Sequence, residues 1–195
     1  AGNLVLSFAL MNIFARTLGG YFGDLFGKFR GLRGRVVFLA LILATEGLML
    51  SIFSVTTSLV LGMIFLIAFS LTVQMAEGAT FSVVPFINKK AIGSISGIVG
   101  AGGNVGAFMA AMLLKSKSAV AESAAIAANS ELGEQAIKAA QTTAAASAVS
   151  SGFFVIGGFI VIAALLSLAI RFATAEEMAV IDETKAELLL SGVDK

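Results

Sequence analysis

The sequence predicts an all-α protein, a multi-pass bundle of transmembrane helices. Of its 195 residues, 58% are apolar and only 13% are charged, whereas an ordinary soluble domain is about 45–50% apolar and about 25% charged. The apolar residues form long runs, and five of these runs approach or exceed the roughly 20 residues that a helix needs to cross a bilayer. The chain has no Cys and no His, which excludes disulfides, thiol nucleophiles, His bases and Cys/His zinc sites.

The five predicted spans follow one another with connections of different lengths. The first begins at Ala1 inside an apolar run, with no charged segment before it, so it does not resemble a signal peptide. We therefore expect a fragment that begins at or inside a membrane helix and belongs to a larger bundle. The spans are residues 1–23, 36–54, 58–87, 91–114 and 152–170.

The charges of the short connections predict the orientation of the bundle. Residues 24–35 carry four basic side chains against Asp24, and residues 88–90 include Lys89 and Lys90. Because short basic loops stay on the cytoplasmic side, both connections are expected in the cytoplasm. The other two connections then face outward, and the C-terminus is cytoplasmic.

The remaining segments carry no predicted site. The connection 116–151 is rich in Ala, Ser and Thr, and its high helix propensity predicts either a surface helix or a mobile insert outside the membrane. Residues 172–195 form an acidic tail after the last span. The expected organisation is therefore membrane helices over 1–115, the outer connection, a last membrane helix over 152–171, and the cytoplasmic tail.

Arg16 is the first charged residue that the pattern places inside a span. It lies eight residues before Asp24, or about 12 Å along a helix, and a charge at that depth requires a polar cavity or a partner. Asn12 lies one turn earlier on the same face. A guanidinium binds a planar oxyanion through two donors at once, so Arg16 and Asn12 are candidate ligands. The alternative is a structural salt bridge to an acid on a neighbouring helix.

Two acids are the other intramembrane charges. Glu77, with Gln74 one turn before it, lies in the third span, and Glu46 lies in the second. Either could be the partner of Arg16 or a proton carrier. A structural polar network is the favoured interpretation of Gln74 and Glu77, and no specific role is assigned to Glu46.

The fourth span is unusually rich in glycine. Glycines recur between Gly93 and Gly106, with Asn104 as the polar amide among them. Small residues let membrane helices approach closely, and they leave equal room for a small ligand. Contact with one neighbouring helix explains glycines on one face of a helix, but here glycines lie on two faces. We therefore take Gly100, Gly103 and Asn104 as candidate binding residues.

A further motif marks the cytoplasmic end of the first span. An acid at a helix C-terminus is disfavoured by the helix dipole, so Asp24 is expected to pair with a loop arginine or with another helix N-terminus. The alternative is a charge cluster that only sets topology. The motif residues are Gly20, Asp24, Gly27, Lys28 and Arg30.

These features together resemble the major facilitator superfamily. Residues 20–30 are similar to its cytoplasmic loop signature. Within that superfamily, residues 15–35, 74–86 and 93–106 resemble the eighth, tenth and eleventh helices of the high-affinity nitrate transporter branch of the nitrate/nitrite porter family, the last of these carrying its second nitrate signature. The resemblance covers residues 1–114 and leaves out the outer connection and the tail.

The resemblance implies a function. The chain would supply five membrane helices, the C-terminal half of a twelve-helix carrier in the cell membrane. Arg16 would match the C-terminal of two arginines that clamp nitrate, and transport would proceed by alternating access, with proton symport favoured over exchange. Expected partners are nitrate or nitrite, protons, membrane lipid and the missing N-terminal half, with no cofactor, metal or nucleic acid. The alternatives are a carrier of another small anion or organic acid, a structural or regulatory membrane protein, and an inactive truncated carrier. An enzyme is not expected, because no nucleophile–base pair is present.

Overall fold

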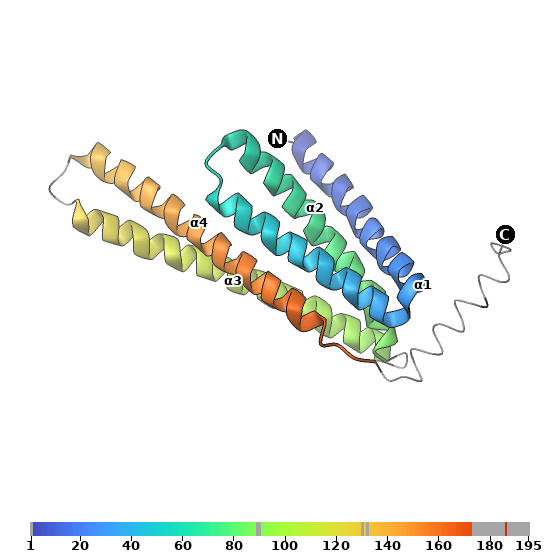
Figure 1. The fold of residues 1–195 in the computed structure, drawn as a ribbon. Coiled ribbons are helices and arrows are strands. Elements are labelled where there is room, and N and C mark those ends of the chain that lie inside the picture. Colours follow the sequence, from blue (N-terminus) through green and yellow to red (C-terminus); the bar gives the residue numbers. More distant parts are fainter. Residues whose placement is uncertain (1, 89–90, 130, 132, 173–185, 187–195) are drawn as a thin grey trace.

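The structure is a computed structural model that describes residues 2–88, 91–129, 131, 133–172 and 186, with side chains from residue 12 onward. Every regular element in these residues is helical, and four helices are long and apolar enough to span a membrane. The predicted helical bundle is thus present (Figure 1), while the acidic tail lies almost wholly outside the described residues. The elements are α1 (Gly2–Val55), α2 (Leu59–Val83), the short 3-10 helix η1 (Val84–Phe86), α3 (Ile92–Ala128) and α4 (Glu134–Ser167).

A sharp turn divides α1 into an N-terminal arm, residues 2–29, and a C-terminal arm, residues 32–55. Arg30 and Gly31 leave the helical region, and Gly31 has φ 60° and ψ −150°, a conformation that glycine adopts without strain. Just after the turn, a Cβ at Gly34 would overlap the backbone of the preceding arm. The chain therefore reverses direction here (Figure 1), and the two arms correspond to the first two predicted spans.

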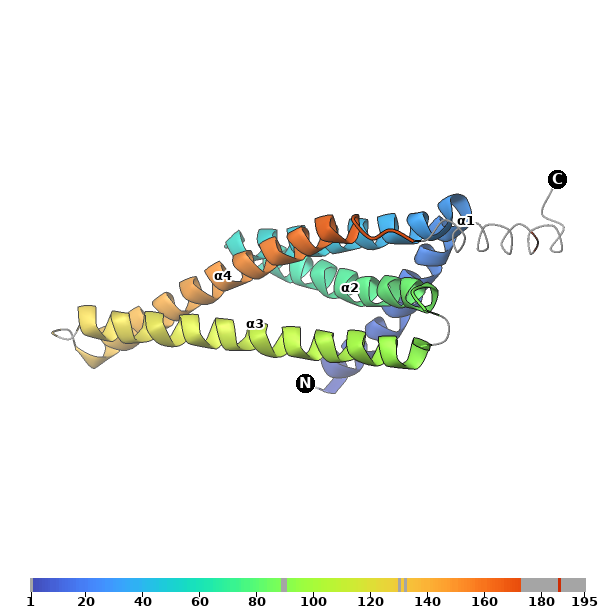
Figure 2. The ribbon, with the colours of Figure 1, turned by 90° about the horizontal axis from the view of Figure 1, so that it is seen from below.

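The connections lie at two opposite ends of the bundle. The turn of α1 and the passage from α2 to α3 share one end, and the α1–α2 connection and the tip of the α3–α4 hairpin lie toward the other (Figure 1). α1 packs against α2 and α4, whereas α3 packs mainly against α4. Figure 2 shows α4 running from beside α3 at the hairpin tip to beside α1 at the other end.

The core lies between the C-terminal arm of α1 and the second half of α2. Its buried side chains recur at helical spacing on both elements, so one apolar stripe faces the other. Phe22, Leu43, Met75 and Phe172 pack around them. The small size of this core fits a chain whose outer surface is solvated by lipid rather than by water. The core residues are Val36, Phe38, Leu39, Ile42, Ala76, Ala79 and Val83.

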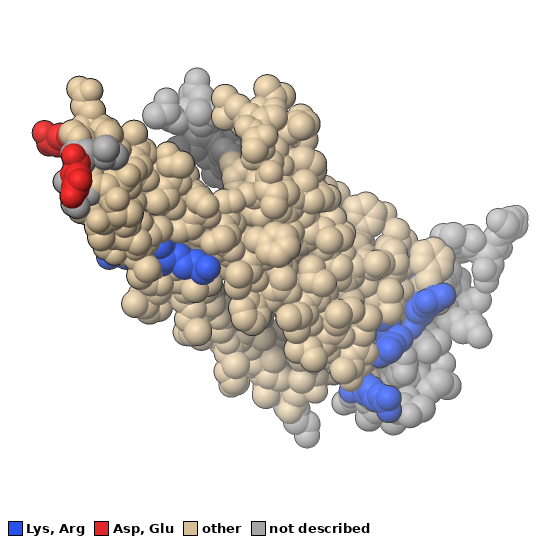
Figure 3. All heavy atoms as spheres, turned by 60° about the vertical axis from the view of Figure 1, so that its left-hand side comes forward, with Lys and Arg blue, Asp and Glu red and all other residues tan. Residues whose placement is uncertain are grey.

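Large apolar side chains cover much of the remaining surface. Phe14 is 69% exposed and Leu59 is 80% exposed, and no described residue of α3 is buried. Figure 3 shows a broad uncharged surface, with charged side chains gathered toward its two ends. Soluble monomers rarely expose apolar patches of this extent, so the surface is that of a membrane protein.

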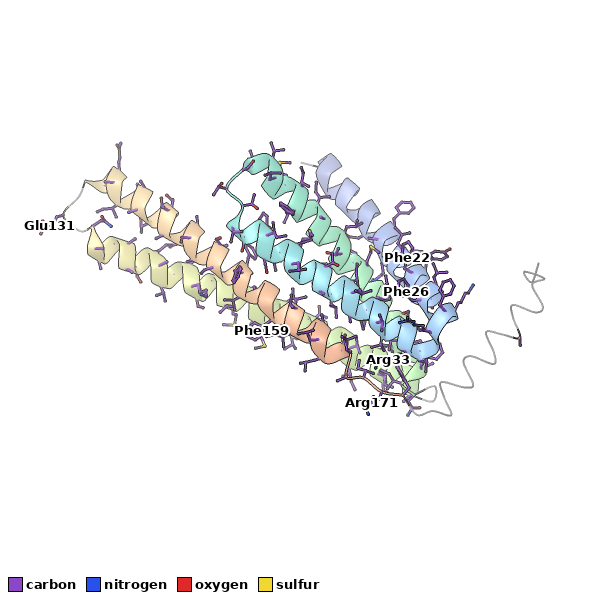
Figure 4. The ribbon with its side chains drawn as sticks, in the orientation of Figure 1. Phe22, Phe26, Arg33, Glu131, Phe159 and Arg171 are labelled. Atoms are coloured by element: carbon purple, nitrogen blue, oxygen red, sulfur yellow. The ribbon has the colours of Figure 1, made fainter. Side chains whose placement is uncertain are left out.

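The last two helices are longer than the predicted spans. α3 continues past residue 114 to Ala128, and α4 begins at Glu134, well before residue 152. The Ala-rich connection is therefore mostly helical, in two antiparallel extensions joined near Glu131 (Figure 4). The apolar runs end earlier than the helices do because Ala continues a helix, while the Ser, Lys and Glu among the alanines lower the hydropathy.

Candidate functional site

The site begins where the N-terminal arm of α1 crosses α2 in direct backbone contact. A Cβ at Gly19 would overlap the carbonyl oxygen of Met75, and a Cβ at Gly78 would overlap the carbonyl oxygen of Arg16. Glycine is therefore required on both helices, as in other close crossings of membrane helices. The crossing fixes the backbone of Arg16 against α2.

Arg16 forms an ion pair with Glu77 of α2, next to this crossing. The exposed fractions of the two side chains are 51% and 42%, so the pair is open at the surface of the bundle rather than sealed in its core. The guanidinium carbon of Arg16 also lies 5.9 Å from the centre of the Phe81 ring, within cation–π range. The acid on a neighbouring helix that the structural alternative requires is thus present, and the guanidinium remains accessible.

An open cleft of about 740 Å³ runs beside Arg16. Its walls come from the N-terminal arm of α1, the start of the C-terminal arm, the end of α2 and η1. A small oxyanion is far smaller than this volume, so the cleft has room for the ion together with water. The lining residues are Arg16, Thr17, Gly20, Asp24, Arg35, Gly78, Phe81, Ser82, Pro85 and Phe86.

Arg35 organises the end of the cleft that lies nearest the turn of α1. Its guanidinium lies 2.7 Å from the Asp24 carboxylate, donates a 2.8 Å hydrogen bond to the carbonyl oxygen of Ser82, and lies 4.4 Å from the centre of the Phe86 ring. A Cβ at Gly27 would come within 2.6 Å of its Nε. Arg35 therefore joins the turn of α1 to the end of α2.

This arrangement supplies the partner of Asp24 that the helix dipole led us to expect, a loop arginine. The pattern-based motif included Lys28 and Arg30, but both of these side chains are exposed. Arg35, Ser82 and Phe86 were missed as site residues. The signal that could have found Arg35 is the reversal at Gly31, because a hairpin turn brings residues before and after it side by side.

The structure does not bring the remaining candidate ligands into the cleft. A Cβ added at Gly100 or Gly103 would have no described atom within 4 Å, and Asn104 is exposed. Asn12 and Gln74 are partly exposed on their own helices, one turn from Arg16 and Glu77, and neither lines the cleft. The reason for the separation of the glycine helix is that α3 packs mainly on α4.

The C-terminal arm of α1 meets α4 in a second close crossing. A Cβ at Gly47 would come within 2.6 Å of the carbonyl oxygen of Gly157, and Ser150 donates a hydrogen bond to the carbonyl oxygen of Ser54. Beside this crossing, Glu46 is buried at 9% exposure. No hydrogen bond or ion pair joins its carboxyl group to another described side chain.

Arg33 ties the end of α4 to the turn of α1. It donates hydrogen bonds of 3.0 and 3.1 Å to the carbonyl oxygens of Leu168 and Ile170, which the end of the helix leaves without internal partners. Figure 4 shows Arg33 and Arg171 at this end of the bundle and Glu131 at the opposite end.

Comparison with known proteins shows which proteins the chain resembles. The chain is 40% identical over 113 residues to High affinity nitrate transporter 2.5 of Arabidopsis thaliana, which covers 58% of this chain and 22% of that protein. It is 44% identical over 108 residues to Nitrate transporter 2.2 of Chlamydomonas reinhardtii, covering 55% and 21%.

Over this region the chain is a homologue of nitrate transporters. It is also 34% identical over 120 residues to the nitrate/nitrite transporter NrtP of Picosynechococcus, covering 60% and 22%. The chain thus spans about a fifth of the length of these relatives. No family model and no solved structure matches it.

These relatives are named as transporters and not as enzymes, which agrees with the prediction of a non-enzyme. Together with the four long apolar helices, the homology identifies a multi-pass membrane protein. The resemblance to high-affinity nitrate transporters that the sequence motifs indicated is thereby confirmed.

Proposed function

We propose that the chain is part of a secondary carrier that moves nitrate, or nitrite, across a membrane by alternating access. One observation carries the proposal. In a homologue of nitrate transporters, an arginine within an apolar helix is held at a glycine crossing and opens onto a cleft of about 740 Å³.

Arg16 is the proposed ligand of the anion. Nitrate is planar, singly charged and weakly hydrated, which suits the delocalised fork of a guanidinium better than a compact ammonium group. The cleft is otherwise lined by small, apolar and neutral side chains, apart from the paired Asp24 and Arg35. An incoming anion therefore meets one accessible cation, whose partner carboxylate Glu77 it must replace.

We further propose the architecture that accompanies this role. The two arms of α1 with α2, α3 and α4 supply five membrane segments, the C-terminal half of a major facilitator fold in the cell membrane. The basic turn 24–35 and the connection 88–90 face the cytoplasm, as does the C-terminus. The α3–α4 tip faces outward. The opposite positions of Arg33 and Glu131 in the bundle support this orientation (Figure 4).

The exposed glycine face of α3 fits the same proposal. Gly100, Gly103 and Asn104 lie on a helix that leaves them open among the described residues, although close approach is what such a face provides. The matched segment covers only about a fifth of each of these relatives, so they have further residues that could cover it. We propose that this face meets the N-terminal half and contributes to the anion site there, with Asn12 as a further support of Arg16.

The test is nitrate binding to the full-length carrier that contains this sequence, with Arg16→Lys as the variant. Lysine keeps the charge and the pair with Glu77 but loses the two-point geometry. A charge-assisted hydrogen bond contributes about 1.5–3 kcal/mol, and about 1.4 kcal/mol corresponds to a tenfold change in affinity. We expect the nitrate Kd to rise roughly ten- to hundredfold.

Two controls accompany this measurement. Circular dichroism and gel filtration establish that the variant is folded, and Lys138→Arg changes a cation far from the cleft and should leave the Kd unchanged. An unchanged Kd in well-folded Arg16→Lys would show that Arg16 is only a structural partner of Glu77. Competition by nitrite and by small carboxylates then distinguishes a nitrate carrier from a carrier of another small anion.

A further inference from the structure

The turn of α1 carries two basic side chains that no described residue pairs. Lys28 and Arg30 are both exposed, and neither forms an ion pair within the part of the chain that the structure describes. Arg33 and Arg35 of the same turn are already engaged with carbonyl and carboxylate oxygens. Phe29, between the first two, is 79% exposed. Residues 28–30 therefore form an unpartnered basic surface, which we call the cationic face.

The chain leaves its last helix beside this face. Arg33 of the turn donates hydrogen bonds to the carbonyl oxygens of Leu168 and Ile170, just after α4 ends, and Phe172 packs against the core. Figure 4 shows Arg33 and Arg171 at the same end of the bundle. The point where the acidic tail begins is thereby held next to the turn of α1.

The tail has the complementary charge and the necessary reach. Glu176 is four residues beyond Phe172, which extended chain can span up to about 14 Å, and Glu187 is 15 residues beyond it, up to about 50 Å. A short tether keeps a group at a millimolar effective concentration, so exposed pairs that are individually weak suffice in combination. Between residues 176 and 187 there is one lysine and there are five acids: Glu176, Glu177, Asp182, Glu183 and Glu187.

We propose that the acidic tail of this chain docks on the cationic face, where carboxylates of residues 176–187 pair with Lys28 and Arg30. The contact is reversible, because ion pairs at a surface are screened as the ionic strength rises. It joins the end of α4 to the turn of α1 a second time, beside the hydrogen bonds of Arg33. The proposal does not depend on which ion the protein transports.

Anionic lipid headgroups are the competing occupant of the cationic face, since basic side chains at a membrane surface attract them. Two features favour the tail. Its start is anchored beside the face by Arg33, so it needs no second molecule. Its five acids also repel other anions from the same place.

The experiment measures disulfide formation between the face and the tail. It uses the full-length protein that contains this sequence, freed of other cysteines, in nanodiscs of neutral phosphatidylcholine. Phe29→Cys and Ala179→Cys place one thiol between Lys28 and Arg30 and one among the acids, and every charge is kept. The Debye length falls from about 10 Å at 0.1 M salt to about 3 Å at 1 M. We therefore expect a disulfide within one chain, formed about tenfold more slowly at the higher salt.

Neutral variants of the same two-cysteine protein test the partners. Lys28→Gln with Arg30→Gln should slow disulfide formation about tenfold at the lower salt. Lys115→Gln with Lys138→Gln is the matched control, since it removes two cations from the α3–α4 hairpin and should leave the rate unchanged. Each rate is divided by the reactivity of the single cysteines toward a neutral maleimide, because neighbouring charges also change how much thiolate is present.

Three results would overturn the proposal. A rate that depends neither on salt nor on Lys28 and Arg30 would show that the thiols meet through proximity alone. A disulfide between two copies would assign the tail to a neighbouring molecule, and loss of the disulfide in nanodiscs that contain anionic lipid would assign the face to headgroups. The salt dependence is measured with all charges in place, so it decides the question even where a neutralised variant does not fold. None of these results bears on nitrate binding at Arg16.

Discussion

Adjacent glycines on α4 provide a sharp test of the second helix crossing. A Cβ at Gly157 would lie 2.8 Å from the carbonyl oxygen of Gly47 and 3.2 Å from the backbone nitrogen of Ser51, whereas a Cβ at Gly158 meets nothing within 4 Å. Ordinary contact begins at 3.4 Å, so Gly157→Ala must separate α1 from α4 by about 0.6 Å. The nearest atom, the Oγ of Ser51, belongs to a side chain that can rotate aside, but the other two are backbone atoms and cannot.

The two alanine variants share the same gain in helix propensity, about 1 kcal/mol over glycine, so their difference isolates packing. Overpacking of a tight contact costs about 1–3 kcal/mol. We therefore expect Gly157→Ala to have a free energy of unfolding lower than that of Gly158→Ala by about 1–3 kcal/mol.

Unfolding of the full-length protein in mixed detergent micelles, followed by circular dichroism, measures both values. Gly47→Ala is a partner variant, because its Cβ would meet Gly157 from the other side at 2.6 Å. Since both substitutions separate the same two backbones, the double variant should lose less than the sum of the single losses. Equal free energies of unfolding for Gly157→Ala and Gly158→Ala would refute the crossing.

Three further predictions concern topology, the glycine helix and the Asp24–Arg35 pair. In this Cys-free chain, an impermeant thiol reagent should label Glu131→Cys from outside and leave Lys28→Cys unlabelled in intact cells, and the reverse pattern would invert the orientation. Gly103→Leu should abolish nitrate uptake without loss of expression. The leucine side chain meets no described atom of this chain, so it would clash only with a helix from outside it. Normal uptake would show that this face of α3 lies in lipid. Arg35→Ala should lower the free energy of unfolding by about 2 kcal/mol, because it removes bonds to Asp24 and to the Ser82 carbonyl, whereas Asp24→Asn should lower it by less than about 1 kcal/mol, as for an exposed pair. Equal losses in the two variants would contradict that ranking.

The helical bundle and its polar positions could be predicted because lipid imposes a simple rule on the sequence. A charge such as Arg16 or Glu77 stands out in an apolar run, and both proved to lie together. The composition of residues 116–151 could not locate the helix ends, because alanine is equally compatible with an extended helix and with a surface segment. Their continuity with α3 and α4 required the structure.

The residues that come together in the cleft could not be predicted from the sequence, for a different reason. The residue that joins α1 to α2, Arg35, looked like one of several topology-setting cations, and its contacts depend on the reversal at Gly31. Conversely, the residue types of Gly100 and Asn104 suggested that they share a binding site with Arg16. Helix packing places them on α3, beside α4, and packing partners are decided by long-range contacts that local patterns do not encode.

Because the α3–α4 hairpin is long, a small tilt at its base displaces its tip by a large distance. α3 has 37 residues and is about 56 Å long, nearly twice the roughly 30 Å thickness of a bilayer core. A tilt of the pair by about 10° about its base would displace the tip by roughly 10 Å, given that length. Small angular changes deep in the bundle would thus become large excursions near Glu131. A pair of spectroscopic probes, one at this tip and one at the turn of α1, would convert rocking of the helices into a distance change large enough to follow in real time.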